Sequence, residues 1–554
     1  MDSVGVYRTP ETGNAAAKVA DRRREDKSLN ESKTRRLQER LGAALLAFLF
    51  WLPAMALGKS HPVRTGSGLI SGVELSHGLE VFRGIPFAAP PAGKLRWQPP
   101  QPPAAWQGVR KAGSFGPPCM QKASPQRLGP WTRVFLSKLQ PSEDCLYLNL
   151  WTTAKRPHPL RPVMVWIYGG GFTSGAGSVP IYDAAALDRQ GVVVVNFNYR
   201  VGPFGFFAYP GLTGESPHHS SGNYGLLDQI AALGWVQRNI AAFGGDPHQV
   251  TLFGQSAGAA SVWLLMQSPL ARGLFERAII MSGPGVLPST VITGERSLAA
   301  AEQEGRKFAG RLNAHSIGQL RALPAGKIVQ DSGGARWAPI QDGWVIRPGW
   351  HPEHEVPVIS GMVAEDIGIG YYGTEPPPPM TLKTYHQRME KLCGAETAEC
   401  EELYPARDHQ QAAAALRAAL EDRARVSLYK WGARQTRWSP QVYTYYFNQK
   451  IPWPQHPEYG VFHSSELPYV FDNLRLMDRP WQPADWRVAR EMASYWVGFA
   501  KTGSPNAKGL HDWPAFRVGN LTTMQLAARM APVPLAAPAR LHFWMENLKD
   551  PLGF

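Results

Sequence analysis

The stretch that decides the fold is TLFGQSAGAAS, residues 251–261. A β-branched and aromatic run leads into Gly254-Gln255-Ser256-Ala257-Gly258, and small residues followed by the apolar run VWLLM come directly after it. A serine between two glycines, where a strand stops and a helix starts, is typical of a nucleophile elbow, because the glycines leave room for the sharp turn that exposes the hydroxyl. A structural tight turn is the alternative interpretation. The motif alone is weak in a chain with 55 glycines, so its context has to support it.

The context is a large folded chain. It has 554 residues, of which 44% are hydrophobic and 18% charged, which allows a large core and excludes a disordered protein. The net charge is +14; residues 1–58 contribute +3, from ten Lys/Arg against seven Asp/Glu. The basic residues after residue 60 are scattered, which favours a solvated basic surface and leaves anionic substrates open. Nothing resembles a nucleic-acid module.

Buried strands and helices alternate along the chain. Apolar, β-branched runs predict strands at 162–169, 191–200, 249–254, 277–283, 356–363 and 441–449. Apolar positions at helical spacing predict helices within 223–245 and from 487 to just before Gly503, and a helical insertion around 381–430 follows a proline-rich loop at 374–380. The pattern predicts an α/β fold, with a mainly parallel central sheet covered by helices on both faces and with helical insertions.

Three further elements complete a candidate site. Tyr168-Gly169-Gly170-Gly171-Phe172 follows a predicted strand, and its glycines would leave backbone N–H groups free for an oxyanion, unless the segment is only a flexible loop. After the strand 356–363 come Glu365 and Asp366, and either carboxylate could orient a histidine. Among fifteen histidines, His463 best fits a loop that follows a late strand.

The N-terminal region has the features of a targeting segment. After a charged stretch, residues 41–58 (LGAALLAFLFWLPAMALG) combine a basic flank, a short apolar run and small residues, which predicts an export signal or an N-terminal anchor. Residues 59–554 then form a single domain. Export to the periplasm or the exterior makes disulfides plausible, with Cys119 and Cys145 as one pair and Cys393 and Cys400 as another. No cysteine spacing resembles a zinc site.

Several segments together resemble the type-B carboxylesterases, the cholinesterase-like branch of the α/β hydrolases. The resemblance covers about residues 64 to 547 and is carried by FRGIPFAAPPAGKLRW, SEDCLYLNLW, VWIYGGGF, NYRVGPFGFF, GNYGLLDQIAALGWVQRNIAAFGGDP, GQSAGAAS, HSSELPYVF and FAKTGSPN. These segments occur in the order found in the family, which makes the resemblance highly specific.

The resemblance implies roles for single residues. Ser256 matches the nucleophile and His463 the general base. The oxyanion donors match the backbone N–H groups of Gly170, Gly171 and Ala257, and the family's first disulfide matches Cys119 and Cys145. The family acid is mostly Glu; here Asp366 stands at its position and Glu365 remains the alternative.

Two departures concern the substrate. Cholinesterases resemble Gly-Glu-Ser-Ala-Gly at the elbow, whereas this chain has Gln255 before the serine. The position of the choline-stacking tryptophan holds Phe135, and Trp131 is four residues away. We therefore expect poor turnover of acetylcholine, because a quaternary ammonium would lack its best cation–π partner and a nearby negative charge.

The resulting prediction is a serine carboxylic-ester hydrolase that acts on a small-molecule ester through an acyl-enzyme and needs no cofactor or metal. A lipase or an amide-cleaving hydrolase with the same triad is one alternative. A non-enzymatic cholinesterase-like binding protein is another, from a different functional class. The preferred ester and the oligomeric state do not follow from the sequence.

Overall fold

The computed structural model describes residues 58–125, 128–154, 159–283, 296–349, 353–366 and 380–548. The chain divides into a unit of residues 1–58 and a unit of residues 59–554. The segment expected to direct export or to anchor the chain lies outside the described residues except for Gly58, and so do residues 374–379 of the proline-rich loop.

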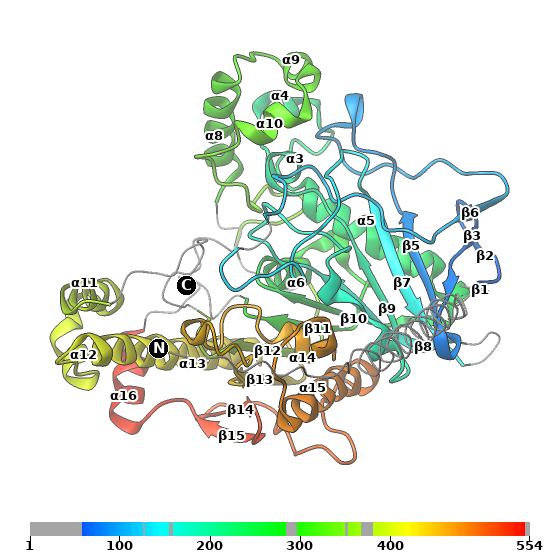
Figure 1. Cartoon of the computed structure of the whole chain (residues 1–554). Coiled ribbons are helices and arrows are strands. Elements are labelled where there is room, and N and C mark those ends of the chain that lie inside the picture. Colours follow the sequence, from blue (N-terminus) through cyan, green and yellow to red (C-terminus); the bar gives the residue numbers. More distant parts are fainter. Residues whose placement is uncertain are drawn as a thin grey trace, which may run out of the picture. The chain divides into compact units, whose positions relative to one another are not determined.

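Within the described residues, a 12-stranded sheet runs through the protein in the order β1-β4-β5-β7-β9-β8-β10-β11-β12-β13-β14-β15 (Figure 1). Its strands are β1 (Gly58–Lys59), β4 (Val73–Glu74), β5 (Glu80–Pro86), β7 (Tyr147–Thr152), β8 (Arg161–Ile167), β9 (Val193–Phe197), β10 (Gly245–Gln255), β11 (Arg277–Met281), β12 (Val358–Val363), β13 (Val442–Phe447), β14 (Thr522–Leu526) and β15 (Ala531–Pro534). The strands from β9 to β14 pair in parallel, whereas the pairs β4–β5, β5–β7, β7–β9 and β14–β15 are antiparallel.

The parallel strands are the ones whose sequences are continuously apolar. Every residue of β9, β12 and β13 is buried, as expected for strands covered on both faces. The register brings the carboxyl ends of neighbouring strands together: Gly254 pairs with Ile167 of β8, and Gln255 pairs with Met281 of β11. Loops that leave this edge therefore start close to one another, which is where open α/β sheets bind ligands.

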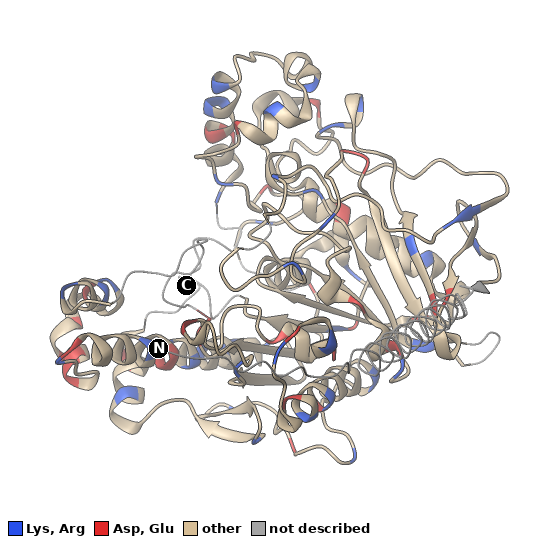
Figure 2. Cartoon of the chain, viewed as in Figure 1, with Lys and Arg blue, Asp and Glu red and all other residues tan. Residues whose placement is uncertain are grey.

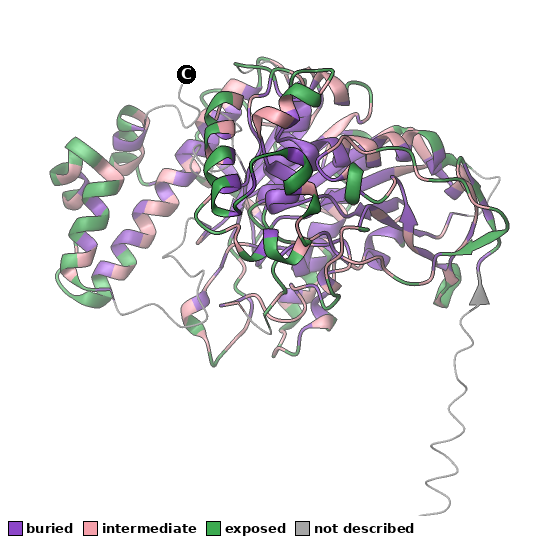
Figure 3. Ribbon diagram, turned by 90° about the horizontal axis from the view of Figure 1, so that it is seen from above, coloured by how far each residue is buried: buried purple, intermediate pink, exposed green. Residues whose placement is uncertain are grey.

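Helices lie on both faces of the sheet, and their inner faces are buried together with the strands (Figure 3). They are α2 (Ala185–Asp188), α3 (Gly202–Phe206), α4 (Pro210–Glu215), α5 (Tyr224–Asn239), α6 (Ala257–Gln267), α8 (Leu298–Arg311), α9 (Ile317–Ala322), α10 (Ala325–Gln330), α11 (Leu382–Cys393), α12 (Thr397–Leu403), α13 (His409–Gln435), α14 (Leu467–Val470), α15 (Pro483–Thr502) and α16 (Pro538–Asn547). Helix α15 ends as predicted at Gly503, whose φ of 79° is favourable for glycine.

Two groups of elements lie outside the central layers. Helices α11, α12, α13 and α16 share a small core of their own, which matches the predicted helical insertion and is extended by the C-terminal helix. A 3-stranded sheet of β2 (Val63–Thr65), β3 (Gly68–Ser71) and β6 (Val109–Lys111) was not predicted, because its strands are short and partly exposed. Lys/Arg and Asp/Glu are interspersed along the described chain in Figure 2.

Candidate active site

Ser256 occupies a strained turn between β10 and α6. Its φ of 59° and ψ of −124° are unusual for a residue with a side chain, and its backbone N–H donates to the carbonyl of Met281 at 2.9 Å. The flanking glycines are required by close packing. A Cβ atom at Gly258 would lie 2.0 Å from the carbonyl oxygen of Ile167, and one at Gly254 would lie 2.5 Å from the carbonyl oxygen of Gly258. The turn is therefore the sharp strand–helix connection that a nucleophile elbow needs.

The glycine-rich loop after β8 packs directly against this turn. A Cβ atom at Gly169 would lie 2.9 Å from the Cβ atom of Ser256. Gly170 and Gly171 have φ values of 121° and 62°, and within the described chain neither of their N–H groups donates a hydrogen bond. Ala257 is the first residue of α6, so its N–H has no helical carbonyl to bind. The three predicted oxyanion donors thus belong to two adjoining segments beside the serine.

The structure distinguishes the two carboxylates that the sequence left open. Asp366 follows β12, its side chain is fully buried, and its Oδ1 pairs with Nδ1 of His463. Its Oδ2 accepts the backbone N–H of Val363 at 3.3 Å. Glu365 instead forms an ion pair with Nε of Arg417 at 3.0 Å. Asp366 is therefore the carboxylate that faces the imidazole.

Glu365 has a separate structural role next to this pair. Its Oε1 accepts the backbone N–H of Val461 at 3.2 Å, and its own N–H donates to the carbonyl of Val461 at 3.1 Å. A Cβ atom at Gly460, where φ is 52°, would lie 1.9 Å from the same Oε1, so a larger residue there would displace the Glu365 carboxylate. Glu365 thus fixes the chain two residues before His463.

The second imidazole nitrogen has a partner that the sequence did not indicate. Nε2 of His463 lies 3.1 Å from Nε2 of Gln255, the buried residue that precedes the nucleophile. Between the described side chains of Ser256 and His463 there is no hydrogen bond. The Gln255 amide also adjoins the glycine-rich loop, because its Oε1 would lie 3.1 Å from a Cβ atom at Gly169. Ser256, the Gln255 amide and the His463 imidazole therefore lie close together at one edge of the sheet.

A buried acid beneath the site was also missed. Glu466 has no exposed surface; it accepts hydrogen bonds from the hydroxyl groups of Tyr445 at 2.6 Å and Ser282 at 3.5 Å. Burial raises the pKa of Glu466 to about 8; the Tyr445 hydrogen bond opposes this rise, and the charge of Asp366 adds to it. A glutamate three residues after a histidine is not distinctive in a sequence, since only the fold shows that it is buried.

Aromatic rings surround the residue before the histidine. Phe462 makes edge-to-face contacts with Trp131 and with Phe135, at centroid distances of 6.2 and 6.1 Å. Trp131, which lies four residues before Phe135 in the sequence, therefore packs against the same ring as Phe135. The three rings form an aromatic cluster around the residue that precedes His463 in the chain.

Two disulfides join the four cysteines: Cys119 with Cys145, and Cys393 at the end of α11 with Cys400 in α12. Disulfides of this kind are typical of oxidising compartments. The described residues hold no helix that is both long and apolar enough to cross a bilayer.

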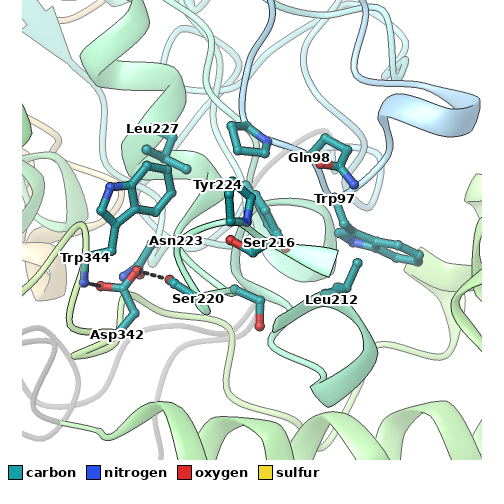
Figure 4. A pocket seen from close by; sticks show the side chains of 13 residues that line it. Trp97, Gln98, Leu212, Ser216, Ser220, Asn223, Tyr224, Leu227, Asp342 and Trp344 are labelled. Carbon is teal, nitrogen blue, oxygen red and sulfur yellow. Dashed lines mark hydrogen bonds between the residues drawn. The ribbon is translucent and has the colours of Figure 1, made fainter. Parts of the chain in front are cut away.

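A pocket of about 350 Å³, which includes its open mouth, lies apart from these residues (Figure 4). Its walls include Trp97, Tyr224 and Trp344, and none of the predicted site residues lines it. The polar groups in it are already paired: Asp342 accepts the Ser220 hydroxyl at 2.6 Å and three backbone N–H groups. No histidine is among the described residues that line this pocket, and it is not the candidate active site.

The mainly parallel sheet and the serine at its strand–helix turn are those of an α/β hydrolase. The model of the Carboxylesterase family matches residues 59–544. The chain is 36% identical over 511 residues to fumonisin B1 esterase of Sphingopyxis macrogoltabida, which covers 87% of this chain and 91% of that relative. It is 34% identical to para-nitrobenzyl esterase of Bacillus subtilis (strain 168), with coverage of 84% and 94%. It is also 32% identical to acetylcholinesterase of Bungarus fasciatus, with coverage of 88% and 86%.

The chain belongs to the carboxylesterase family, and it is a serine carboxylic-ester hydrolase. The family, the fold class and the esterase activity predicted from the sequence are thereby confirmed. The roles of single residues stay predictions, which are developed next.

Proposed function

We propose that the enzyme hydrolyses small-molecule esters through an acyl-enzyme on Ser256, with His463 as general base and Asp366 as the acid that orients it. The observation that carries this proposal is the pairing of Asp366 with Nδ1 of His463, at the sheet edge where the strained turn presents Ser256. A carboxylate at Nδ1 keeps the proton there, so that Nε2 carries the lone pair that acts as the base.

The reaction then proceeds in two similar halves. His463 takes the proton of Ser256 as the hydroxyl oxygen attacks the ester carbonyl, and the resulting imidazolium protonates the leaving alcohol. Water repeats the sequence on the acyl-enzyme and releases the acid. Asp366 stabilises the imidazolium without taking its proton.

The negative oxygen of each tetrahedral intermediate would bind the N–H groups of Gly170, Gly171 and Ala257. Support comes from their free donors and from the contact of the glycine-rich loop with Ser256. Donors of this kind lower the barrier by a few kcal/mol each, about 3 to 4 in measured cases, because they are fixed before charge develops.

The aromatic cluster of Trp131, Phe135 and Phe462, next to His463 in the chain, favours esters with an apolar or aromatic group. Two relatives, para-nitrobenzyl esterase and fumonisin B1 esterase, are named for the esters on which they act. Esters with an apolar or aromatic group are therefore the substrate class that we propose.

Ser256→Ala tests the nucleophile. The variant should lose hydrolysis of aryl acetates and labelling by an organophosphate, while its circular dichroism stays that of the wild type. A burst of acyl-enzyme in this variant would contradict the assignment.

A matched pair of variants tests the acid. Asp366→Asn should lower kcat by up to about 10⁴-fold, because an amide favours the wrong imidazole tautomer. Glu365→Gln makes the same chemical change one residue away and should retain most of kcat. A larger loss in Glu365→Gln than in Asp366→Asn would reassign the acid to Glu365.

We also propose that the protein is exported. The two disulfides support an oxidising compartment, and the segment 41–58 has the pattern of an export signal. N-terminal sequencing of the protein from its native host tests this: a start near residue 59 supports a cleaved signal, and an intact N-terminus supports the anchor.

A further inference from the structure

Both nitrogens of His463 have partners in the resting enzyme. Nδ1 faces the Asp366 carboxylate, which can only accept a hydrogen bond when it is ionised, so the imidazole proton lies on Nδ1. Nε2 then carries the lone pair, and its partner at 3.1 Å is the side-chain amide nitrogen of Gln255. The hydrogen-bond network thus assigns Gln255 as the donor and Nε2 as the acceptor.

Building on the proposed roles of Ser256 and His463, we propose that Gln255 is a positioning residue that holds the base neutral and in one tautomer between turnovers. An amide N–H can bind Nε2 only while that nitrogen is unprotonated. The hydrogen bond therefore stabilises the neutral imidazole and not the imidazolium, which keeps the base active at lower pH.

The Gln255 amide and the Ser256 side chain both lie against the glycine-rich loop. A Cβ atom at Gly169 would lie 2.9 Å from the Ser256 Cβ and 3.1 Å from the Gln255 Oε1, so the two side chains are neighbours. At the start of a turnover, Nε2 releases the Gln255 N–H and accepts the Ser256 proton. The serine O–H bond breaks, an Nε2–H bond forms, and the oxygen electron pair forms the bond to the carbonyl carbon.

The other charged groups around His463 do not provide this effect. Asp366 stabilises the imidazolium and so acts in the opposite direction. Glu365 is paired with Arg417. Glu466, hydrogen-bonded to Tyr445, has a pKa raised by burial to about 8, so it carries no charge at acid pH.

The test is the dependence of kcat/KM on pH for an aryl acetate, from about pH 5 to about pH 9, where the acid limb reports the protonation of His463. Gln255→Glu places a carboxylate at Nε2, which stabilises the imidazolium and should raise the midpoint of this limb by about 1 pH unit or more. Gln255→Met removes the donor without adding charge and should raise the midpoint by less. Gln387→Glu, exposed on α11, makes the same change in net charge and should leave the midpoint unchanged.

The proposal is supported if the midpoint of the acid limb rises from wild type to Gln255→Met and again to Gln255→Glu. It is overturned if the acid limbs of all three proteins coincide. If Gln255→Glu does not fold, Gln255→Met decides alone, since it buries no charge. Active-site titration with an organophosphate corrects each rate for the fraction of folded enzyme. The proposed function fails separately: activity retained in Ser256→Ala refutes the nucleophile whatever the pH profiles show.

Discussion

Glu466 provides a quantitative test of the buried network beneath the active site. Burial raises its pKa from an ordinary value of 4.5 to about 8. Between these two pH values the folded protein keeps a proton that the unfolded chain has released. The unfolded state therefore binds fewer protons there, and the free energy of unfolding falls as the pH rises through this range.

The magnitude follows from the difference between the two pKa values. A rise from 4.5 to about 8 corresponds to about 5 kcal/mol of lost stability above pH 8 and to none below about pH 4. Glu466→Gln removes the titration but keeps the shape of the protonated acid. Its amide oxygen can accept the Tyr445 hydroxyl, and its NH₂ group can donate to Ser282. We expect the variant to gain stability relative to wild type as the pH rises, by up to about 5 kcal/mol.

Thermal unfolding of the two proteins at a series of pH values measures this gain. A domain of about 500 residues has an unfolding entropy near 1 kcal/mol per degree, so the difference in Tm should widen by about 3 to 5 °C between pH 5 and pH 8.5. Glu390→Gln, an exposed change of the same kind on α11, should show no such trend. A difference in Tm between Glu466→Gln and wild type that is the same at all pH values would refute the reasoning.

Three further predictions concern the elbow, a buried ion pair and the substrate. Gly258→Ala places a Cβ atom 2.0 Å from the carbonyl oxygen of Ile167, so thermal unfolding should show a loss of about 1 to 3 kcal/mol or more, together with a large drop in esterase rate. Arg200→Leu leaves the carboxylate of Asp228 buried without its guanidinium and should cost about 3 to 5 kcal/mol in denaturant unfolding; the double variant with Asp228→Leu should recover most of it. Acetylcholine should have a lower kcat/KM than phenyl acetate, because the neutral Gln255 before the nucleophile offers a quaternary ammonium no negative charge.

The central strands could be predicted because burial on both faces leaves a simple pattern. The runs at 191–200, 277–283 and 356–363 are almost continuously apolar, and they form β9, β11 and β12. The strands at the edges of the sheet, and the small second sheet, have weaker sequence patterns. Strand β15 contains two prolines, and β2, β3 and β6 are short and partly exposed, so none of them has a recognisable period.

The parts of the candidate site that depend on a local backbone conformation could be predicted from the sequence. The glycines beside Ser256 and in the loop at 169–171 are required by the backbone conformation and its close packing, so they can be recognised as motifs. The contacts of Gln255 and Glu466 depend on segments about two hundred residues apart, or on burial by the whole fold. Such contacts are set by sheet register, which no local pattern encodes.

The choice between the two adjacent carboxylates shows how that register acts. Glu365 binds the backbone of Val461 in both directions and pairs with Arg417, so the chain after β12 is fixed against the chain that carries the histidine. Asp366 follows Glu365 by one residue, and His463 follows Val461 by two, which brings the shorter carboxylate to the imidazole. A Glu side chain at position 366, which has one more methylene, would reach past Nδ1 of His463 unless this attachment shifted. Asp366→Glu should therefore lower kcat. A second change, Glu365→Ala, removes the side-chain acceptor of the Val461 N–H and the partner of Arg417, and should recover part of the loss. If the double variant is no better than Asp366→Glu alone, this side-chain attachment does not set the reach of the acid.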